Sequence, residues 1–435
     1  MDPSLSTIAD KVEQGIRLTA DDGMTLFTSP DLWSVCSLAD RVRRRLHGNQ
    51  AYYNVNRHVN YTNVCALSCS FCAFYRKSDD DGAYEFSVRQ VADQAAEAQA
   101  AGATEIHIVG GLHPYLPFAY YLDMLRAIRE AAPRLHIKAF TAVEIVHLAR
   151  IDKRPKELEQ ILSDLKDAGL GSLPGGGAEV FDDRVHDEAF KGKIRSDKWL
   201  DVHRAAHRIG LNTNATILYG HIESLEDRIH HMELLRQAQD EALHDWAQSL
   251  QGVSQSQEYQ DHGRVVLTGP DAMYGINGNG AGNRLPQPSD TSGYFQTIIP
   301  LPFIPDDSAL QHLPGPAGLD NLRMIAVSRL MLDNLPHVKA FWIMQTLPLA
   351  QIMLQSGADD MDGTVVWYDI TKVGGTDTHQ EVDVTKLRRT IVEAGCVPVE
   401  RDTLYRPITR NGPDWHVAAQ PDPTHAPEAP GSIAS

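Results

Sequence analysis

From about residue 50 onward the sequence repeats one pattern, in which a short apolar strand, a polar loop, an amphipathic helix and a glycine follow one another. The clearest unit begins at Ser87, a favourable N-cap, continues through residues 88–101 and stops at Gly102, before the strand "TEIHIV". Similar units begin at Ser196 and Ser224. Because strands that alternate with helices pair in parallel, the pattern predicts a parallel sheet covered by helices.

Eight strand candidates follow one another along the chain. They occupy residues 54–62, 104–109, 136–142, 170–173, 213–219, 294–300, 338–343 and 364–368. Eight strands in this alternation predict an α/β fold, a (β/α)8 barrel of the TIM type with N-terminal helical and C-terminal extensions. In such a barrel the loops that follow the strands form one rim, and the chemistry takes place there.

The pattern also divides the chain into segments. Residues 1–48 predict a helical extension, residues 49–405 the barrel, and residues 406–435 a Pro-rich, disordered tail. Within the barrel, residues 242–292 are rich in Gly, Ser, Gln and Asn and carry no periodic core pattern. We interpret this stretch as a surface insertion on the face opposite the rim.

Charge and hydropathy exclude several classes of partner. The formal net charge is −17, which argues against a basic footprint for nucleic acid or an anionic membrane surface. No apolar run is long enough to insert into a membrane, and the N-terminus lacks the basic and apolar parts of a signal peptide. We therefore expect a cytoplasmic protein.

Three of the five cysteines are crowded into the stretch "NVCALSCSFCAF". Cys65, Cys69 and Cys72 have C-x3-C-x2-C spacing directly after the first predicted strand. A structural zinc site needs four ligands, and His58 or His113 would have to supply the fourth. A 4Fe-4S cluster matches the spacing better, because three thiolates hold three irons and leave the fourth iron open for chemistry.

The cysteine spacing, with the aromatic Phe71 before the last cysteine, resembles the signature of the radical S-adenosylmethionine (SAM) superfamily. The resemblance implies a 4Fe-4S cluster on Cys65, Cys69 and Cys72, with SAM bound to the open iron beside Phe71. It further implies that an electron from the cluster releases a 5'-deoxyadenosyl radical. A reducing electron donor such as flavodoxin or ferredoxin would then be a partner.

The same resemblance assigns cofactor-binding residues on the rim. Gly110 and Gly111 match the glycine pair that lets the backbone approach the amino group of SAM. Glu144, Glu179 and Glu223 each follow a predicted strand, where a carboxylate would bind ribose hydroxyls or the amino group of SAM. The segment "GGGAE" at 175–179 lacks the lysine of a phosphate-binding P-loop, so we reject that reading.

Further motifs resemble the branch of the superfamily that serves the futalosine pathway of menaquinone biosynthesis. They are "NRHVNYTNVC", "FCAFYRK", "GGLHP", "AFTAVEI", "GGGAEVF", "NATILYGHIES" and "DDMDGTV". The resemblance implies a transferase that joins the 5'-deoxyadenosyl group of SAM to 3-[(1-carboxyvinyl)oxy]benzoate, a small aromatic enol ether with two carboxylates. For this substrate we assign Arg76 to one carboxylate. His58, His113 and Tyr75 would order the substrate or transfer a proton.

Two alternatives stay open from the sequence. Cyclic dehypoxanthinyl futalosine synthase and the deazaflavin-chromophore synthase subunits share the cysteine motif, and they use SAM only to abstract hydrogen. The segment "DDMDGTV" at 359–365 favours the adenosyl-transferring reading over these relatives. The other alternative is a non-catalytic iron-sulfur or zinc-binding protein.

Overall fold

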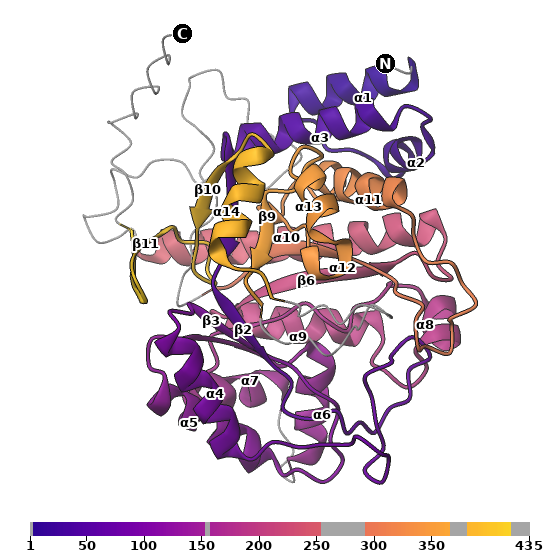
Figure 1. Cartoon of the computed structure of the whole chain (residues 1–435). Helices are drawn as coiled ribbons and strands as arrows, with labels where there is room; N and C mark the ends of the chain where they lie inside the picture. Colours follow the sequence, from indigo (N-terminus) through magenta and orange to yellow (C-terminus); the bar gives the residue numbers. More distant parts are fainter. Residues whose placement is uncertain (1–2, 153–156, 254–291, 366–380, 419–435) are drawn as a thin grey trace.

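The structure is a computed structural model that describes residues 3–152, 157–253, 292–365 and 381–418 (Figure 1). Within these residues, seven parallel strands form one curled sheet whose spatial order is the order of the chain. They are β2 (Asn56–Val59), β3 (Glu105–Ile108), β4 (His136–Ala139), β5 (Ser172–Leu173), β6 (Asn212–Tyr219), β7 (Phe295–Pro302) and β8 (His337–Val338). The predicted α/β barrel type is therefore confirmed.

A smaller parallel sheet lies next to the first and last strands of the larger one. It contains β10 (Val397–Glu400), β1 (Gln50–Asn54) and β9 (Asp360–Gly363), in that order. β9 pairs with β1, and a bridge from Lys339 to Asp360 joins it to the end of β8. β9 thus takes the place of the predicted eighth strand, four residues earlier than expected. Residues 366–368 of that predicted strand lie outside the described residues.

Helices connect consecutive strands on the outside of the sheet (Figure 1). They are α4 (Val88–Ala100), α5 (Phe118–Ala131), α6 (Ala142–Ile151), α7 (Leu158–Ala168), α8 (Asp183–Ala189), α9 (Ser196–Arg208), α10 (Leu225–Val253) and α11 (Gly318–Met331). The predicted N-cap Ser87 accepts a hydrogen bond from the N–H of Gln90 at the start of α4. None of the helices in the described ranges has the length and apolar character needed to cross a bilayer.

Where the sequence predicts a helical extension, three helices precede β1 in the described chain: α1 (Pro3–Gln14), α2 (Ala20–Thr28) and α3 (Leu32–His47). α3 packs along α11, and α2 packs along α10. Helices α12 (Trp342–Gln345), α13 (Leu347–Met353) and α14 (Val384–Glu393) follow the last strands of the larger sheet.

The predicted insertion at 242–292 is wrong at its start. Residues 242–253 continue α10, because Leu243 and Trp246 bury their side chains together with Tyr294. Residues 254–291, the rest of the predicted insertion, lie outside the described residues.

The predicted disordered tail at 406–435 is also wrong for its first part. β11 (Ile408–Asn411) and β12 (Asp414–Val417) form an antiparallel hairpin there. Trp415 Nε1 donates to the carbonyl of Ala103 at 3.2 Å, and Arg410 pairs with Glu400, so side chains fix the hairpin to the barrel. Residues 419–435 lie outside the described residues.

Alternation along the strands places charged side chains inside the barrel. In β3, Ile106 and Ile108 are fully buried in the main hydrophobic core, while Glu105 and His107 line the cavity within the barrel. Successive strand residues point to opposite faces, so one strand serves the core and the cavity at once. This arrangement builds the site described next.

Candidate active site

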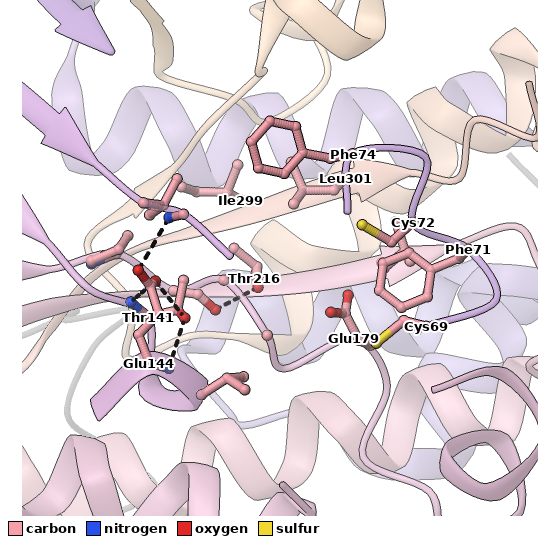
Figure 2. A pocket seen from close by; sticks show the side chains of 18 of the residues that line it. Cys69, Phe71, Cys72, Phe74, Thr141, Glu144, Glu179, Thr216, Ile299 and Leu301 are labelled. Atoms are coloured by element: carbon pink, nitrogen blue, oxygen red, sulfur yellow. Dashed lines mark hydrogen bonds between the residues drawn. The ribbon is translucent and has the colours of Figure 1, made fainter. Parts of the chain in front are cut away.

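A cavity of about 280 Å³ lies inside the barrel, below the loops that follow the strands. Cys65, Cys69 and Cys72 line it from the irregular segment between β2 and α4. All three thiols are half-buried. Figure 2 shows Cys69 and Cys72 at one side of the cavity, close to Glu179, with Phe71 on the same loop. The structure thus places the predicted metal ligands where a bound group would open into a cavity.

Backbone N–H groups contact the sulfur atoms of Cys65 and Cys72. The N–H of Leu112 points at Cys65 Sγ from 3.4 Å, and backbone N–H groups of Phe74 and Tyr75 interact with Cys72. Burial raises the pKa of Cys69 to about 11, so this thiol stays protonated at neutral pH until a metal ion displaces the proton. Amide donors to sulfur suit the anionic sulfurs of an iron-sulfur cluster.

An ion pair that includes the predicted Glu179 lies beside the cysteines. Lys193 Nζ donates to Glu179, and the two side chains are 12% and 10% exposed. The ammonium lies 5.0 Å from the centre of the Phe71 ring, and its charge opposes the burial-driven rise in the pKa of Cys69. Lys193 therefore favours negative charge at this side of the cavity. No motif in the sequence singles out Lys193.

The predicted glycines allow the end of β3 to approach the cysteine loop. A Cβ on Gly111 would lie 2.2 Å from the carbonyl oxygen of Val64, and one on Gly110 would lie 2.7 Å from the ring of Tyr61. The N–H of Gly111 donates to the carbonyl of Thr62 at 2.9 Å. Both glycines line the cavity. Neither position has room for a Cβ, which explains the residue type at both.

Glu144 lines the cavity, but its two oxygens accept hydrogen bonds from the protein itself. Oε2 accepts from the N–H and the hydroxyl of Thr141, at 2.8 and 2.9 Å, in the capping box of α6. Oε1 accepts from the Tyr61 hydroxyl at 3.0 Å and from the N–H of Gly110 at 3.1 Å. Burial raises the pKa of Glu144 to about 7. The carboxylate thus links the segments that follow β2, β3 and β4, and Figure 2 shows it beside Thr141.

Arg76 and Glu223 are not among the described residues that line the cavity. The guanidinium of Arg76 donates to the carbonyls of Ala73 and Tyr75, at 3.0 and 2.8 Å, so it braces the cysteine loop. Glu223 accepts from the N–H of Gly220 and from Arg228. The carboxylate-binding role expected for Arg76 and the SAM-binding role expected for Glu223 therefore gain no support from their placement.

The two predicted histidines also lie outside the set of described residues that line the cavity. His58 is buried against His107, with ring centres 4.4 Å apart, and burial lowers its pKa to about 4. His113 Nε2 lies 2.9 Å from the Glu85 carboxylate, and Nδ1 accepts from the N–H of Leu116. Neither position suits a fourth ligand for zinc bound to the cysteines. Tyr75, the remaining predicted residue, does line the cavity.

Two ion pairs that the sequence reasoning missed form what we call the charged floor, defined as Glu105, Lys138, Lys339 and Asp362. Lys138 Nζ donates to Glu105 at 2.8 Å, and Lys339 Nζ donates to Asp362 at 2.9 Å. All four side chains line the cavity and are at most 6% exposed. The available signal was a charged residue inside an otherwise apolar strand, as in "HIKAF".

Apolar side chains form another wall of the cavity. They include Phe74, Ile299, Leu301, Phe303, Phe341 and Met344. Figure 2 shows Phe74, Ile299 and Leu301 on the same side of the cavity. A small molecule with an apolar body and charged ends fits such a site, with three thiols at one end and buried charges at the other.

Comparison with protein families supports this reading of the site. The model of the radical SAM superfamily matches residues 59–235, and the CofH/MqnC C-terminal region matches residues 292–412. The first match contains the cysteine loop. The second contains the apolar wall except Phe74, and it contains Lys339 and Asp362 of the charged floor.

Three curated relatives match nearly the whole chain. The chain is 39% identical to aminodeoxyfutalosine synthase of Thermus thermophilus, over 94% of this chain and 96% of the relative. It is 37% identical to aminodeoxyfutalosine synthase of Streptomyces coelicolor, over 96% and 97%. It is 32% identical to 5-amino-6-(D-ribitylamino)uracil--L-tyrosine 4-hydroxyphenyl transferase of Methanopyrus kandleri, over 92% and 95%.

Among solved structures, methylornithine synthase superposes with a TM-score of 0.61 at 17% identity, covering 90% of this chain and 97% of the other. This likeness concerns the fold alone. The family matches and the curated relatives show that the chain is an enzyme of the radical SAM superfamily, in the group with the CofH/MqnC C-terminal region.

Proposed function

We propose that this chain is an aminodeoxyfutalosine synthase of menaquinone biosynthesis. It would join the 5'-deoxyadenosyl group of SAM to the vinyl carbon of 3-[(1-carboxyvinyl)oxy]benzoate. The substrate loses one carboxylate, methionine is released, and the product is 6-amino-6-deoxyfutalosine. The observation that carries this proposal is the identity of 37–39% to two aminodeoxyfutalosine synthases over nearly the full length of both chains.

The cysteine end of the cavity suits the cofactors that the superfamily implies. Cys65, Cys69 and Cys72 would hold a 4Fe-4S cluster with one iron open for SAM. When bound, the cluster supplies the electron that cleaves SAM, which acts both as cofactor and as co-substrate. The amide donors at Cys65 and Cys72 and the charge of Lys193 offset the negative charge of the sulfurs.

The rest of the cavity suits an aromatic substrate. The apolar wall offers Phe74, Phe303 and Phe341 to the ring, and the barrel encloses the reacting atoms. Enclosure matters chemically, because a primary carbon radical abstracts hydrogen from any suitable neighbour. We further infer that a reducing protein such as flavodoxin or ferredoxin donates the electron, and that the enzyme works in the cytoplasm.

The similarity to the Methanopyrus kandleri transferase favours a second candidate function. At 32% identity over 92% of this chain, that relative supports a reaction between tyrosine and 5-amino-6-(D-ribitylamino)uracil. The reaction of cyclic dehypoxanthinyl futalosine synthase belongs to the same alternative. In both reactions the 5'-deoxyadenosyl radical formed from SAM would only abstract a hydrogen atom, and it would be released as free 5'-deoxyadenosine.

The products of an anaerobic incubation separate these functions. Reconstituted, reduced protein is mixed with SAM labelled in its adenosyl group and with 3-[(1-carboxyvinyl)oxy]benzoate, and the products are analysed by mass spectrometry. We expect a labelled adduct with the mass of 6-amino-6-deoxyfutalosine, formed in the same molar amount as methionine. Labelled 5'-deoxyadenosine without adduct would contradict the proposal, and a parallel incubation with tyrosine and the diaminouracil tests the second candidate.

A further inference from the structure

The charged floor brings two buried ammonium groups to one cavity. Lys138 comes from β4 and Lys339 follows β8, so the pair exists only because the sheet is curled. Burial lowers the pKa of Lys138, and the charge of Lys339 lowers it further. Each ammonium is paired with a carboxylate, and both lysines line the same cavity, so a ligand there meets two positive groups that the protein already holds in place.

Both ammonium groups have donors beyond their carboxylate partners. An ammonium carries three N–H donors. In the described part of the chain, Lys138 Nζ donates one hydrogen bond, to Glu105, and Lys339 Nζ donates one, to Asp362. Because both lysines line the cavity, their remaining donors are within reach of a ligand there.

The segment "DDMDGTV", which the sequence analysis singled out, supplies part of this floor. Asp359 pairs with Arg329, and Asp360 pairs with Arg401. The third aspartate of the segment, Asp362, pairs with Lys339. Of the three, only Asp362 is a described residue of the cavity lining. Asp362 is therefore the member of the motif that is placed to affect a substrate.

Depth along the strands indicates which part of a substrate meets the floor. Lys138 of β4 pairs in register with His107 of β3, and Gly110, which contacts the segment leading into the cysteine loop, lies three residues after His107. At about 3.3 Å per residue, Lys138 lies roughly 10 Å from that level. The vinyl carbon must meet the adenosyl group near the cysteines. The ring carboxylate, at the other end of the substrate, then points toward the floor.

We propose that Lys138 and Lys339 together bind the ring carboxylate of the substrate. The identity of this ligand rests on the proposed function. A carboxylate between two ammonium groups relieves their mutual repulsion and forms charge-assisted hydrogen bonds with both. Glu105 and Asp362 hold the lysines in position before the substrate arrives. This pair takes the carboxylate-binding role that the sequence suggested for Arg76.

Kinetics with two substrates test the pair. Lys339→Met is compared with the unchanged enzyme, using the dicarboxylate and 2-phenoxyacrylate, the analogue that lacks the ring carboxylate. We expect the KM for the dicarboxylate to rise roughly 10- to 100-fold. The KM for the analogue should change less than about threefold, because the lost interaction is absent there. A matched control is Lys386→Met, an exposed lysine of α14. Lys138→Met should behave like Lys339→Met.

A lysine variant that fails to fold is replaced by the double variant Lys339→Met/Asp362→Asn, which leaves no unpaired buried charge. Equal KM changes for both substrates would overturn the proposal. If the unchanged enzyme forms no adduct, the proposed function fails on its own. Calorimetric titration of the cluster-loaded protein with the dicarboxylate then decides the lysine pair: binding about tenfold weaker in the lysine variants supports it, and equal affinities overturn it.

Discussion

The functional groups at the two ends of the cavity are supported by different kinds of structure. At the cysteine end, half-buried thiols lie on an irregular loop between β2 and α4. At the floor, four charged side chains on or next to strands are at most 6% exposed and already paired. The cluster that the family implies would complete the cysteine end, whereas the protein alone completes the floor. Loss of the cluster and loss of folding stability should therefore be separable by mutation.

The largest expected effect is at the cysteine end. Cys69→Ala removes one of three iron ligands, so iron content and adduct formation should fall to background. The loop thiol is half-buried, so we expect the free energy of unfolding of the metal-free protein to change by less than about 1 kcal/mol. Iron analysis, electron paramagnetic resonance and urea unfolding measure the two effects. Cys36→Ala, at a buried cysteine of α3, is the control and should keep its iron.

Full iron loading of Cys69→Ala would remove the basis for the cluster assignment. A large loss of stability in the metal-free variant would instead show that the cysteine end, like the floor, contributes to folding stability.

At the charged floor we expect the opposite result, a large loss of folding stability. Glu105→Gln leaves the buried ammonium of Lys138 without its carboxylate, which should lower the free energy of unfolding by about 3–5 kcal/mol. Urea unfolding of metal-free protein measures this loss. The double variant Glu105→Gln/Lys138→Met should recover most of it, since no unpaired charge remains. A single variant as stable as the unchanged protein would show that the pair does not contribute as described.

The pH dependence of stability gives a smaller effect near the floor. Burial lowers the pKa of His58 from 6.5 to about 4. Below pH 6.5 the His58 imidazole binds a proton in the unfolded chain but stays neutral in the folded chain. The stability that neutral His58 contributes is therefore lost as the pH falls toward 4. The loss amounts to about 3 kcal/mol. Urea unfolding at several pH values between 4.5 and 7.5 gives the free energy of unfolding as a function of pH. This free energy should change less with pH in His58→Gln than in the unchanged protein, and an equal change would contradict the prediction.

The smallest effect concerns the contact between β3 and the cysteine loop. Gly111→Ala places a Cβ against the carbonyl of Val64, so the loop must shift, at a cost of about 1–3 kcal/mol. Iron loading should fall in part, because Cys65 is the next residue in that loop. Gly318→Ala is the control, since a Cβ there meets no atom within 4 Å. Equal stability and iron content in the two variants would argue against the close approach.

The sequence predicted local features well. β3 was expected at 104–109 and lies at Glu105–Ile108, because hydrophobic alternation and a preceding Gly102 define it locally. The three cysteines were singled out as candidate ligands for the same reason, since their spacing is a property of eight consecutive residues. In both cases the deciding signal lies within a short stretch of chain.

Ion pairs between residues on different strands could not be predicted in this way. Lys138 and Glu105 are 33 residues apart, and Lys339 and Asp362 are 23 apart, so their contacts depend on which strands become neighbours. The local contacts of Arg76 were equally hidden from the sequence, because its guanidinium donates to carbonyls one and three residues away and Arg76 is not a described residue of the cavity lining. Knowledge of the strand order would have made the floor residues recognisable.

The arrangement of cofactors and substrate in the cavity can be seen in a crystal structure of the anaerobic, cluster-loaded enzyme with SAM and 3-[(1-carboxyvinyl)oxy]benzoate. We predict a 4Fe-4S cluster on Cys65, Cys69 and Cys72, the vinyl carbon facing the adenosyl group, and the ring carboxylate in hydrogen-bond contact with Lys138 and Lys339. A substrate whose ring carboxylate lies at the cysteine end, bound by Arg76 and away from both lysines, would contradict this prediction.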